Sequence, residues 1–461
     1  MTLIKSISGI RGTIGGKQGD GLSPVDVVKF SLAFGTWINK RSNGQRTKIV
    51  IGRDARLSGE MVKNLVVGAL QSIGIDVIDL GLSTTPTVEI AVTDQNANGG
   101  IILTASHNPK QWNALKLLNE KGEFISGEDG AEVLAIADKS DFEYANVDHI
   151  GSYFQNETYL HKHIDKILAL PLVDGDLVRA QNFKVAVDAV NSTGGIYVPE
   201  LLKALGCEVV ELYCQPTGRF PHNPEPLPEN LIEISSVVKK NNCDLGVVVD
   251  PDVDRLAIVC EDGEMFGEEY TLVAVADYVL QHQKTPTVSN LSSTRALRDV
   301  TEKAGETYHA SAVGEVNVVT KMKEVGAAIG GEGNGGIIFP ELHYGRDALV
   351  GIALFLTHLA KSGKRTSMLR ASYPNYHISK NKIELTPEIN VDDILKKVKE
   401  KYKNYPVNTI DGVKIEFDSE WVHLRKSNTE PIIRIYTESS NLTTAINLAN
   451  KLISDIKEII K

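Results

Sequence analysis

Short runs rich in β-branched residues recur along this chain, and each run ends in a polar turn followed by a helical pattern. The unit occurs five times, as KIVIGRDARLSG (48–59), IILTASHNP (101–109), KVAVDAVNSTGG (184–195), LGVVVDPDVDR (245–255) and PTVSNLSSTRAL (286–297). Apolar strands that alternate with helices are typical of α/β proteins with parallel or mixed sheets. Such sheets bind ligands at the carboxyl ends of their strands, where these polar turns fall. The turns are therefore candidate site loops.

The same pattern indicates domain boundaries. A helical segment near Asn156 and a strand at Lys184 start a second block, and a third block starts around Val259. Beyond Pro374 the residue pattern changes. Two strand-like segments, WVHL and IIRIYTE, flank the turn RKSNTEP, and an amphipathic helix follows over residues 442–460. We expect α/β domains over residues 1–155, 156–258 and 259–373, and a separate α+β domain over 374–461.

Charge limits the class of partner. The 461 residues include 49 lysines and arginines against 59 acidic residues, which gives a net charge of -10. This balance argues against a nucleic-acid binder, although a local basic site for an anionic small molecule is compatible with it.

No segment indicates export, membrane insertion or redox chemistry. The start MTLIKSISGIRG has no apolar core for a signal peptide, and the longest apolar run, residues 348–356, is too short to span a membrane. The four cysteines show no CxxC spacing, so we expect reduced packing residues and no zinc site. A cytoplasmic protein is expected.

DPDVDR places three aspartates, Asp250, Asp252 and Asp254, at alternate positions directly after an apolar run. Carboxylates this close repel by roughly 4 kcal/mol per pair at 4 Å, so such a cluster usually holds a hard cation. A calcium EF-hand loop is the alternative, since the twelfth position from Asp250 is Glu261. However, Arg255 stands where that loop needs glycine, and strand-like residues follow. The pattern favours a Mg²⁺ site in a strand-end loop.

The glycine loop GGEGNGG, residues 330–336, fits the dinucleotide-binding pattern GxGxxG. That pattern should open a helix, yet the extended residues 337–340 follow, so a pyrophosphate would find no helix N-terminus. Glu332 and Asn334 suit the recognition of sugar hydroxyls better, because a carboxylate accepts and an amide donates hydrogen bonds.

Two turns offer other groups. RKSNTEP, with Arg434 just beyond it, supplies the guanidinium, hydroxyl and amide donors that a phosphate dianion requires, although a solvated hairpin would also fit. TASHNP ends an apolar strand on Ser106 and His107, and taken alone it is equally consistent with an ordinary turn. The arginines of GRDARLSG and SGIRG also lie near turns, and neither stretch is informative by itself.

Taken in order, these segments resemble the α-D-phosphohexomutase family, the phosphoglucomutase and phosphomannomutase group. The similarity includes SGIRG near the start, TASHNP as the phosphoserine loop, DPDVDR as the metal loop, GEGNGG as the sugar loop and RKSNTEP as the phosphate loop. The resemblance implies three related mixed-sheet α/β domains and a C-terminal phosphate-binding α+β domain around a central cleft.

The resemblance also implies an isomerase that interconverts hexose 6-phosphate and hexose 1-phosphate. Ser106 would carry a phosphoryl group, and a bisphosphate intermediate would turn over within the cleft. Mg²⁺ and a hexose 1,6-bisphosphate activator would be required, and the partner would be a small-molecule sugar phosphate, with no nucleic acid or membrane.

Site residues follow from the matched motifs. The metal ligands would be Ser106, Asp250, Asp252 and Asp254. Lys116 would be the general acid/base, assisted by His107, Arg11 and Arg255, and we expect neighbouring cations and partial burial to lower its pKa. The substrate would be bound by Glu332, Asn334, Arg425, Ser427, Asn428, Thr429 and Arg434.

The sequence departs from the family pattern in two places. Many bacterial relatives have Glu-x-Ser-Gly-His in the sugar loop, where this chain has Asn334 in place of serine and no histidine. Some relatives carry a lysine where this chain has Ser292-Ser293-Thr294-Arg295, which leaves Arg295 as a substitute. The start SGIRGT and the missing histidine resemble the phosphoglucosamine mutases, so we expect glucosamine phosphate as substrate, with glucose or mannose phosphate as the alternative.

Two other function classes are compatible with a serine beside an aspartate-bound metal. One is a phosphatase that hydrolyses its phosphoserine, and the other is a catalytically silent sugar-phosphate binder. Serine-type metallophosphatases usually need two metals with histidine ligands, whereas a single aspartate cluster is present, and every expected catalytic position is filled. The mutase hypothesis is therefore preferred.

Overall fold

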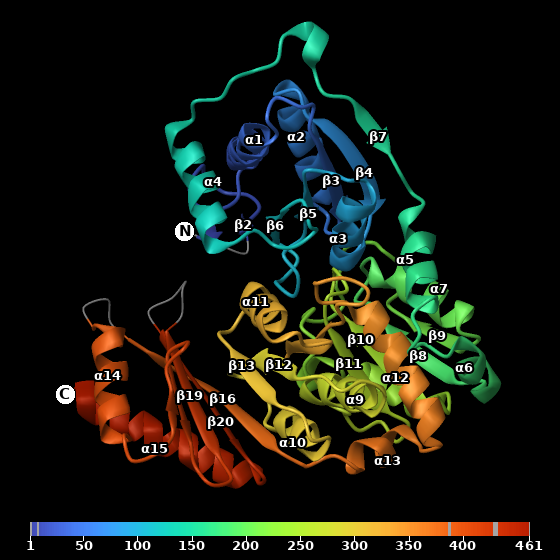
Figure 1. The fold of residues 1–461 in the computed structure, drawn as a ribbon, viewed down its shortest axis with the longest axis vertical. Coiled ribbons are helices and arrows are strands. Elements are labelled where there is room, and N and C mark those ends of the chain that lie inside the picture. The colour runs from blue at the N-terminus through green and yellow to red at the C-terminus, as the bar shows by residue number, and fades with distance from the viewer. Residues whose placement is uncertain (1, 7–8, 386–388, 427–431, 461) are drawn as a thin grey trace. The chain divides into compact units, whose positions relative to one another are not determined.

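The chain forms two compact units, each built from two separate segments. The computed structural model describes residues 2–6, 9–385, 389–426 and 432–460 (Figure 1). The first unit comprises Met1–Thr271 with Gly335–Leu369, and the second comprises Leu272–Asn334 with Arg370–Lys461. The bounds of the four domains expected from the sequence remain a prediction, because the two units are defined by compactness and not by the repeated strand and helix units.

The first unit contains a seven-stranded mixed sheet in the order β1-β2-β6-β5-β3-β4-β7. Strands β5, β3, β4 and β7 run parallel, whereas β6, β2 and β1 join as antiparallel strands. The strands are β1 (Ile4–Ser6), β2 (Gly9–Thr13), β3 (Lys48–Arg53), β4 (Asp76–Leu82), β5 (Gly99–Leu103), β6 (Trp112–Leu118) and β7 (Tyr153–Gln155). The accompanying helices are α1 (Pro24–Arg41), α2 (Gly59–Ser72), α3 (Thr85–Asp94) and α4 (Gly127–Lys139). The predicted mixed sheet is confirmed.

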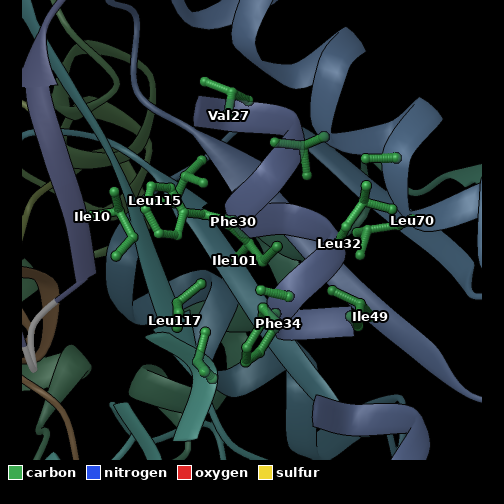
Figure 2. Close-up of a cluster of buried hydrophobic side chains, with 14 of the residues drawn as sticks. Ile10, Val27, Phe30, Leu32, Phe34, Ile49, Leu70, Ile101, Leu115 and Leu117 are labelled. Carbon is green, nitrogen blue, oxygen red and sulfur yellow. The ribbon is translucent and has the colours of Figure 1, made fainter. Parts of the chain in front are cut away.

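The core of this sheet lies between its strands and the apolar faces of α1 and α2. Phe30, Phe34 and Leu70 from the helices meet Ile101 and Leu115 from β5 and β6 (Figure 2). Every residue of β5 is buried, which is why its sequence is a continuous apolar run. Helix α1 begins after Ser23, which forms a capping box with Asp26. The packed sheet gives the loop after β5 a rigid base.

A second sheet of the first unit has the order β11-β10-β8-β9. Strands β8, β9 and β10 are parallel, and β11 returns antiparallel to β10. The strands are β8 (Lys184–Asp188), β9 (Glu208–Leu212), β10 (Leu245–Val249) and β11 (Leu256–Cys260). The helices are α5 (Tyr159–Leu168), α6 (Gly175–Gln181), α7 (Gly194–Ala204), α8 (Ile232–Lys240) and α12 (Ala348–Ser362), while α13 (Thr366–Ala371) contains the boundary after Leu369. DPDVDR therefore links two buried strands, as its sequence predicts, and no helix follows it.

The second unit contains three parallel strands in the order β13-β12-β14, followed by a five-stranded antiparallel sheet in the order β16-β20-β19-β18-β17. The strands are β12 (Thr287–Asn290), β13 (Tyr308–Ser311), β14 (Ile329–Glu332), β16 (His377–Glu384), β17 (Val407–Asn408), β18 (Val413–Glu416), β19 (Trp421–Lys426) and β20 (Ile432–Ser439). The helices are α10 (Ala296–Lys303), α11 (Glu315–Val325), α14 (Val391–Lys401) and α15 (Leu442–Ile460). The antiparallel sheet and α15 confirm the predicted C-terminal α+β fold, while α9 (Glu268–His282) contains the first boundary between the units.

The four cysteines are packed in the interior of the protein. Cys207, Cys214, Cys243 and Cys260 are buried and form no disulfide. Within the described part of the chain, no helix has the length and apolar character that a membrane crossing requires.

Candidate active site

The loop after β5 presents Ser106 to the loop after β10. Ser106 Oγ donates a hydrogen bond to Asp250 Oδ2 at 2.8 Å, and His107 Nδ1 lies 3.5 Å from the same Oγ. Ser106 has a positive φ of 48°, in the left-handed region that L-residues rarely adopt. The two loops therefore form one site, and the TASHNP turn is a constrained structure and not a solvated link.

The three aspartates of DPDVDR form a buried cluster of oxygen atoms. Asp250, Asp252 and Asp254 are fully buried, and one carboxylate oxygen of each lies within 4.8 Å of the others. Burial first, and then the charges of Asp254 and Asp252, raises the pKa of Asp250 well above its ordinary value. Among the described residues, neither Asp252 Oδ1 nor Asp254 Oδ1 accepts a hydrogen bond. Buried carboxylate oxygens with open acceptor capacity are the donor set that Mg²⁺ prefers, so these residues fit that ion.

Lys116 lies against this cluster from β6. Its Nζ is 2.7 Å from Asp252 Oδ2 and 3.4 Å from Asp254 Oδ2. Burial acts to lower the pKa of Lys116, but the charges of Asp252 and Asp254 outweigh it and raise the pKa above its ordinary value. The expected lowering of this pKa is therefore wrong, because the charged neighbours that dominate at Lys116 are carboxylates and not cations.

Two residues outside the predicted motifs contact the same aspartates. Arg346 Nη2 lies 2.7 Å from Asp254 Oδ2, and Thr85 Oγ1 donates to Asp252 Oδ2 at 2.5 Å. Arg346 precedes α12, and Thr85 is the first residue of α3. Their local signal was weak, because each lies beside the N-cap of a helix, Thr84 for α3 and Asp347 for α12, where the sequence indicates only a helix start.

The remaining predicted catalytic residues surround the cluster. Arg255 lies 3.9 Å from Asp254 Oδ1 through Nε and 3.4 Å from Glu225 through Nη1. Arg11 lies on β2 opposite Ala114, so its strand is the direct neighbour of the strand that carries Lys116. Burial, followed by the charge of Arg255, lowers the pKa of His107 well below its ordinary value.

The sugar-loop residues belong to the second unit. Glu332 ends β14, is buried, and accepts hydrogen bonds at Oε1 from Asn290 Nδ2 at 2.8 Å and from the Gly314 N–H at 3.1 Å. β15 (Gly336–Ile338) begins four residues later, which confirms the predicted extended path and excludes a dinucleotide loop. Asn334 lies in the connecting loop. The backbone N–H of Arg295 donates a hydrogen bond to Glu438 Oε1 at 3.0 Å.

Two of the predicted phosphate-binding residues, Arg425 and Arg434, lie on neighbouring antiparallel strands of the C-terminal sheet. Arg425 on β19 is directly opposite Arg434 on β20, and Arg425 Nε is 2.9 Å from Asp411 Oδ2. Ser427, Asn428 and Thr429 lie outside the described residues. Two guanidinium groups at opposed positions repel unless an anion or carboxylate compensates them, so this pair suits a phosphate.

Comparison with known proteins decides the family. The phosphoglucomutase/phosphomannomutase alpha/beta/alpha domains I, II and III match residues 3–144, 161–263 and 267–376, and the C-terminal domain of the same family matches residues 384–453. The chain belongs to this family.

Similar proteins agree with the assignment. A phosphoglucomutase/phosphomannomutase from Thermococcus kodakarensis is 37% identical over 436 residues, which cover 93% of this chain and 94% of the relative. A phosphoglucosamine/phosphogalactosamine mutase from Sulfurisphaera tokodaii is 32% identical, with 98% of each chain covered. The solved structure of a phosphoglucomutase/phosphomannomutase family protein from Burkholderia thailandensis superposes with a TM-score of 0.84 at 26% identity and covers 99% of this chain and 98% of its own. This member of the family is a phosphohexomutase, an isomerase of hexose phosphates, and its acidic cluster could bind the Mg²⁺ on which the family depends.

Proposed function

We propose that the enzyme interconverts hexose 6-phosphate and hexose 1-phosphate through a phosphoserine at Ser106 and a bisphosphate intermediate. The observation that carries the proposal is the 2.8 Å contact between Ser106 Oγ and Asp250, which puts a nucleophile at the edge of a buried acidic cluster. A hexose 1,6-bisphosphate would load the first phosphoryl group.

In this proposal Ser106, Asp250, Asp252 and Asp254 hold one Mg²⁺. The bound ion would offset negative charge on the phosphoryl oxygens. Thr85 and Arg346 each bond an oxygen of one aspartate, and they thereby fix the direction of the carboxylates. Their contacts support a rigid ligand set, because Asp252 and Asp254 each have Oδ2 restrained, whereas their Oδ1 atoms accept no hydrogen bond from the described residues.

The transfer step moves a phosphoryl group between two oxygens. A sugar hydroxyl oxygen forms a bond to phosphorus, the bond from phosphorus to Ser106 Oγ breaks, and the hydroxyl proton ends on Oγ. Lys116 is proposed to act as general acid/base: its ammonium group, which the raised pKa keeps charged, donates a proton to Oγ, and the amine that results takes the hydroxyl proton. His107 lies beside Oγ, and Arg11 and Arg255 would compensate charge. The reverse step returns the other phosphate of the bisphosphate to Ser106.

The second unit is proposed to recognise the sugar phosphate. Glu332 and Asn334 would bind hydroxyl or amino groups of the hexose. The non-transferred phosphate would be bound by Arg425, Ser427, Asn428, Thr429 and Arg434. Support comes from the Glu332 carboxylate, which Asn290 holds by a hydrogen bond, and from the arginines that lie opposite each other on β19 and β20.

Glucosamine phosphate is the proposed substrate, and glucose or mannose phosphate is the alternative. Glu332 can pair with a protonated 2-amino group, and such a charge-assisted hydrogen bond is stronger than one to a neutral hydroxyl. The name of the Sulfurisphaera tokodaii relative supports the amino sugar, whereas that of the Thermococcus kodakarensis relative supports the alternative.

One substrate panel tests the proposal. kcat/KM is measured for the 1-phosphates of glucosamine, glucose and mannose at one concentration of hexose 1,6-bisphosphate, with isomerised sugar phosphate and released inorganic phosphate both quantified. A tenfold preference for a neutral sugar, about 1.4 kcal/mol of transition-state discrimination, would reverse the substrate assignment. Inorganic phosphate as the main product would identify a phosphatase.

A further inference from the structure

Arg56 lies against the Ser106 loop. Its side chain is hydrogen-bonded to Asp54 and to main-chain carbonyl oxygens of that loop. It belongs to the connection between β3 and α2, in the GRDARLSG stretch whose arginines were uninformative in the sequence. Its side chain is fully buried, as is that of Asp54, and its Cζ lies over the Phe220 ring, 5.1 Å from the ring centre. A buried guanidinium is costly unless its donors are paired, so its hydrogen bonds show what it holds.

All five side-chain N–H donors of Arg56 are used. One is bonded to Asp54, and the other four are bonded to carbonyl oxygens of residues 106–112. Nε donates to Asp54 Oδ2 at 2.9 Å. Nη1 donates to the carbonyl oxygens of Pro109 at 2.8 Å and Trp112 at 3.0 Å. Nη2 donates to the carbonyl oxygens of Asn108 at 2.7 Å and Ser106. A guanidinium has five donors in a fixed plane, and here each has an acceptor.

The same network restrains the other side of the Ser106 peptide. The Ser106 N–H donates to Thr104 Oγ1 at 2.9 Å, and Thr104 Oγ1 donates to Asp54 Oδ2 at 2.7 Å. Ser106 is therefore held through its N–H and its carbonyl oxygen, and both paths meet at Asp54. This restraint maintains the left-handed φ of Ser106, which is unfavourable for an L-residue.

We propose that Arg56 is a positioning residue for phosphoryl transfer, which acts by holding the Ser106 loop so that Oγ faces Asp250. The inference rests on the proposed function, because it takes Ser106 as the phosphoryl acceptor. Arg56 contacts no reacting atom. Its role follows from the planar arrangement of its donors, and an ammonium group could not reproduce it, since lysine has three donors on one atom.

Arg56→Lys keeps the charge and removes the five-bond geometry. We expect kcat to fall about a hundredfold, the cost associated with a misplacement of about 1 Å, while KM changes less than threefold. Single-turnover phosphorylation of Ser106 by glucose 1,6-bisphosphate, followed by intact mass, should slow by the same factor. Arg53→Lys is the matched control, because Arg53 lies in the same segment and pairs with exposed Glu60 at 3.0 Å.

Thr104→Val covers the case in which Arg56→Lys does not fold. It leaves the ion pair of Arg56 with Asp54 intact and removes the hydroxyl between Ser106 and Asp54, so kcat should fall about tenfold with little change in KM. All assays are made at least 15 °C below each variant's Tm, so loss of folded protein does not contribute. If the folded variants keep kcat and the phosphorylation rate within threefold of the wild type, the positioning role is wrong. If the wild type and Arg53→Lys are themselves neither phosphorylated nor active, the proposed function fails, and the inference fails with it.

Discussion

Ser106 Oγ donates a hydrogen bond to Asp250 Oδ2 at 2.8 Å, although the two residues are 144 positions apart in the chain. The contact joins the end of one buried strand to the end of another, in two different sheets of the same unit. This hydroxyl, held against a carboxylate of the acidic cluster, is the group that we propose to accept the phosphoryl group beside a bound cation. The predictions below test each component of that arrangement.

Removing the Ser106 hydroxyl should abolish turnover. Ser106→Ala deletes the phosphoryl acceptor and leaves the loop contacts of Arg56 with the main chain in place, so the Tm should change little. Intact mass should show a phosphorylated fraction in the wild type and none in the variant. Ser72→Ala, which alters a serine near the end of α2, serves as control, and full activity of Ser106→Ala would refute the assignment.

Removing one charge from the acidic cluster should impair catalysis through the metal. Asp252→Asn is expected to lower kcat/KM at least a hundredfold, because one ligand charge is lost from a site that must hold a divalent cation. Asp262→Asn, in the exposed turn after β11, should leave activity unchanged. Treatment of the wild type with a strong chelator should abolish activity, and Mg²⁺ should restore it; an enzyme indifferent to the chelator would contradict the metal site.

Glu332 should discriminate amino from neutral sugars. Glu332→Gln keeps the size of the side chain and removes its charge, so kcat/KM for glucosamine 1-phosphate should fall about ten times more than for glucose 1-phosphate. The control Glu324→Gln alters an exposed carboxylate that pairs with Lys321 at 2.9 Å. An equal loss for both sugars would mean that Glu332 contacts no ammonium group.

A buried cluster of charged residues in the first unit should make the protein less stable as the pH rises into the alkaline range. His343 lies between Glu89, at 3.2 Å, and Asp347, at 3.3 Å, and Asp347 also bonds His163 at 2.9 Å. Burial opposes the charged form, but Asp347 and Glu89 raise the pKa of His343 to about 10. The resulting stabilisation is complete below the ordinary pKa of histidine and is lost as the pH rises through about 10.

The variant His343→Gln removes this contribution. At about 1.4 kcal/mol per pKa unit, the upper limit of the loss is roughly 5 kcal/mol below pH 6.5. The difference in unfolding free energy between wild type and variant, measured in urea at pH 6.5, 8 and 9.5, should shrink as the pH rises. His161→Gln, an exposed histidine on α5, should show no such trend, and a difference that is constant with pH would contradict the charged state of His343.

Much of the fold and several site loops were predictable because they depend on neighbouring residues. Buried strands are continuous apolar runs, as in β5 and β10, and the three aspartates of DPDVDR are close whatever the rest of the chain does. The helix over 442–460 follows from its amphipathic period, and the structure has α15 there. The order of the loops along the chain was sufficient to recognise the family.

Sequence by itself therefore determined the α/β class, the identity of the candidate loops and the family to which they belong. Tertiary structure alone decided that Thr85 and Arg346, 167 and 92 residues away from their aspartates, restrain the metal loop. It also decided that the pKa of Lys116 is raised and that Arg56 points inward to hold Ser106. The physical reason is that a pKa and a buried hydrogen bond depend on distance and desolvation summed over all neighbours in space, whereas an arginine beside a turn has the same local sequence whether it faces water or the core.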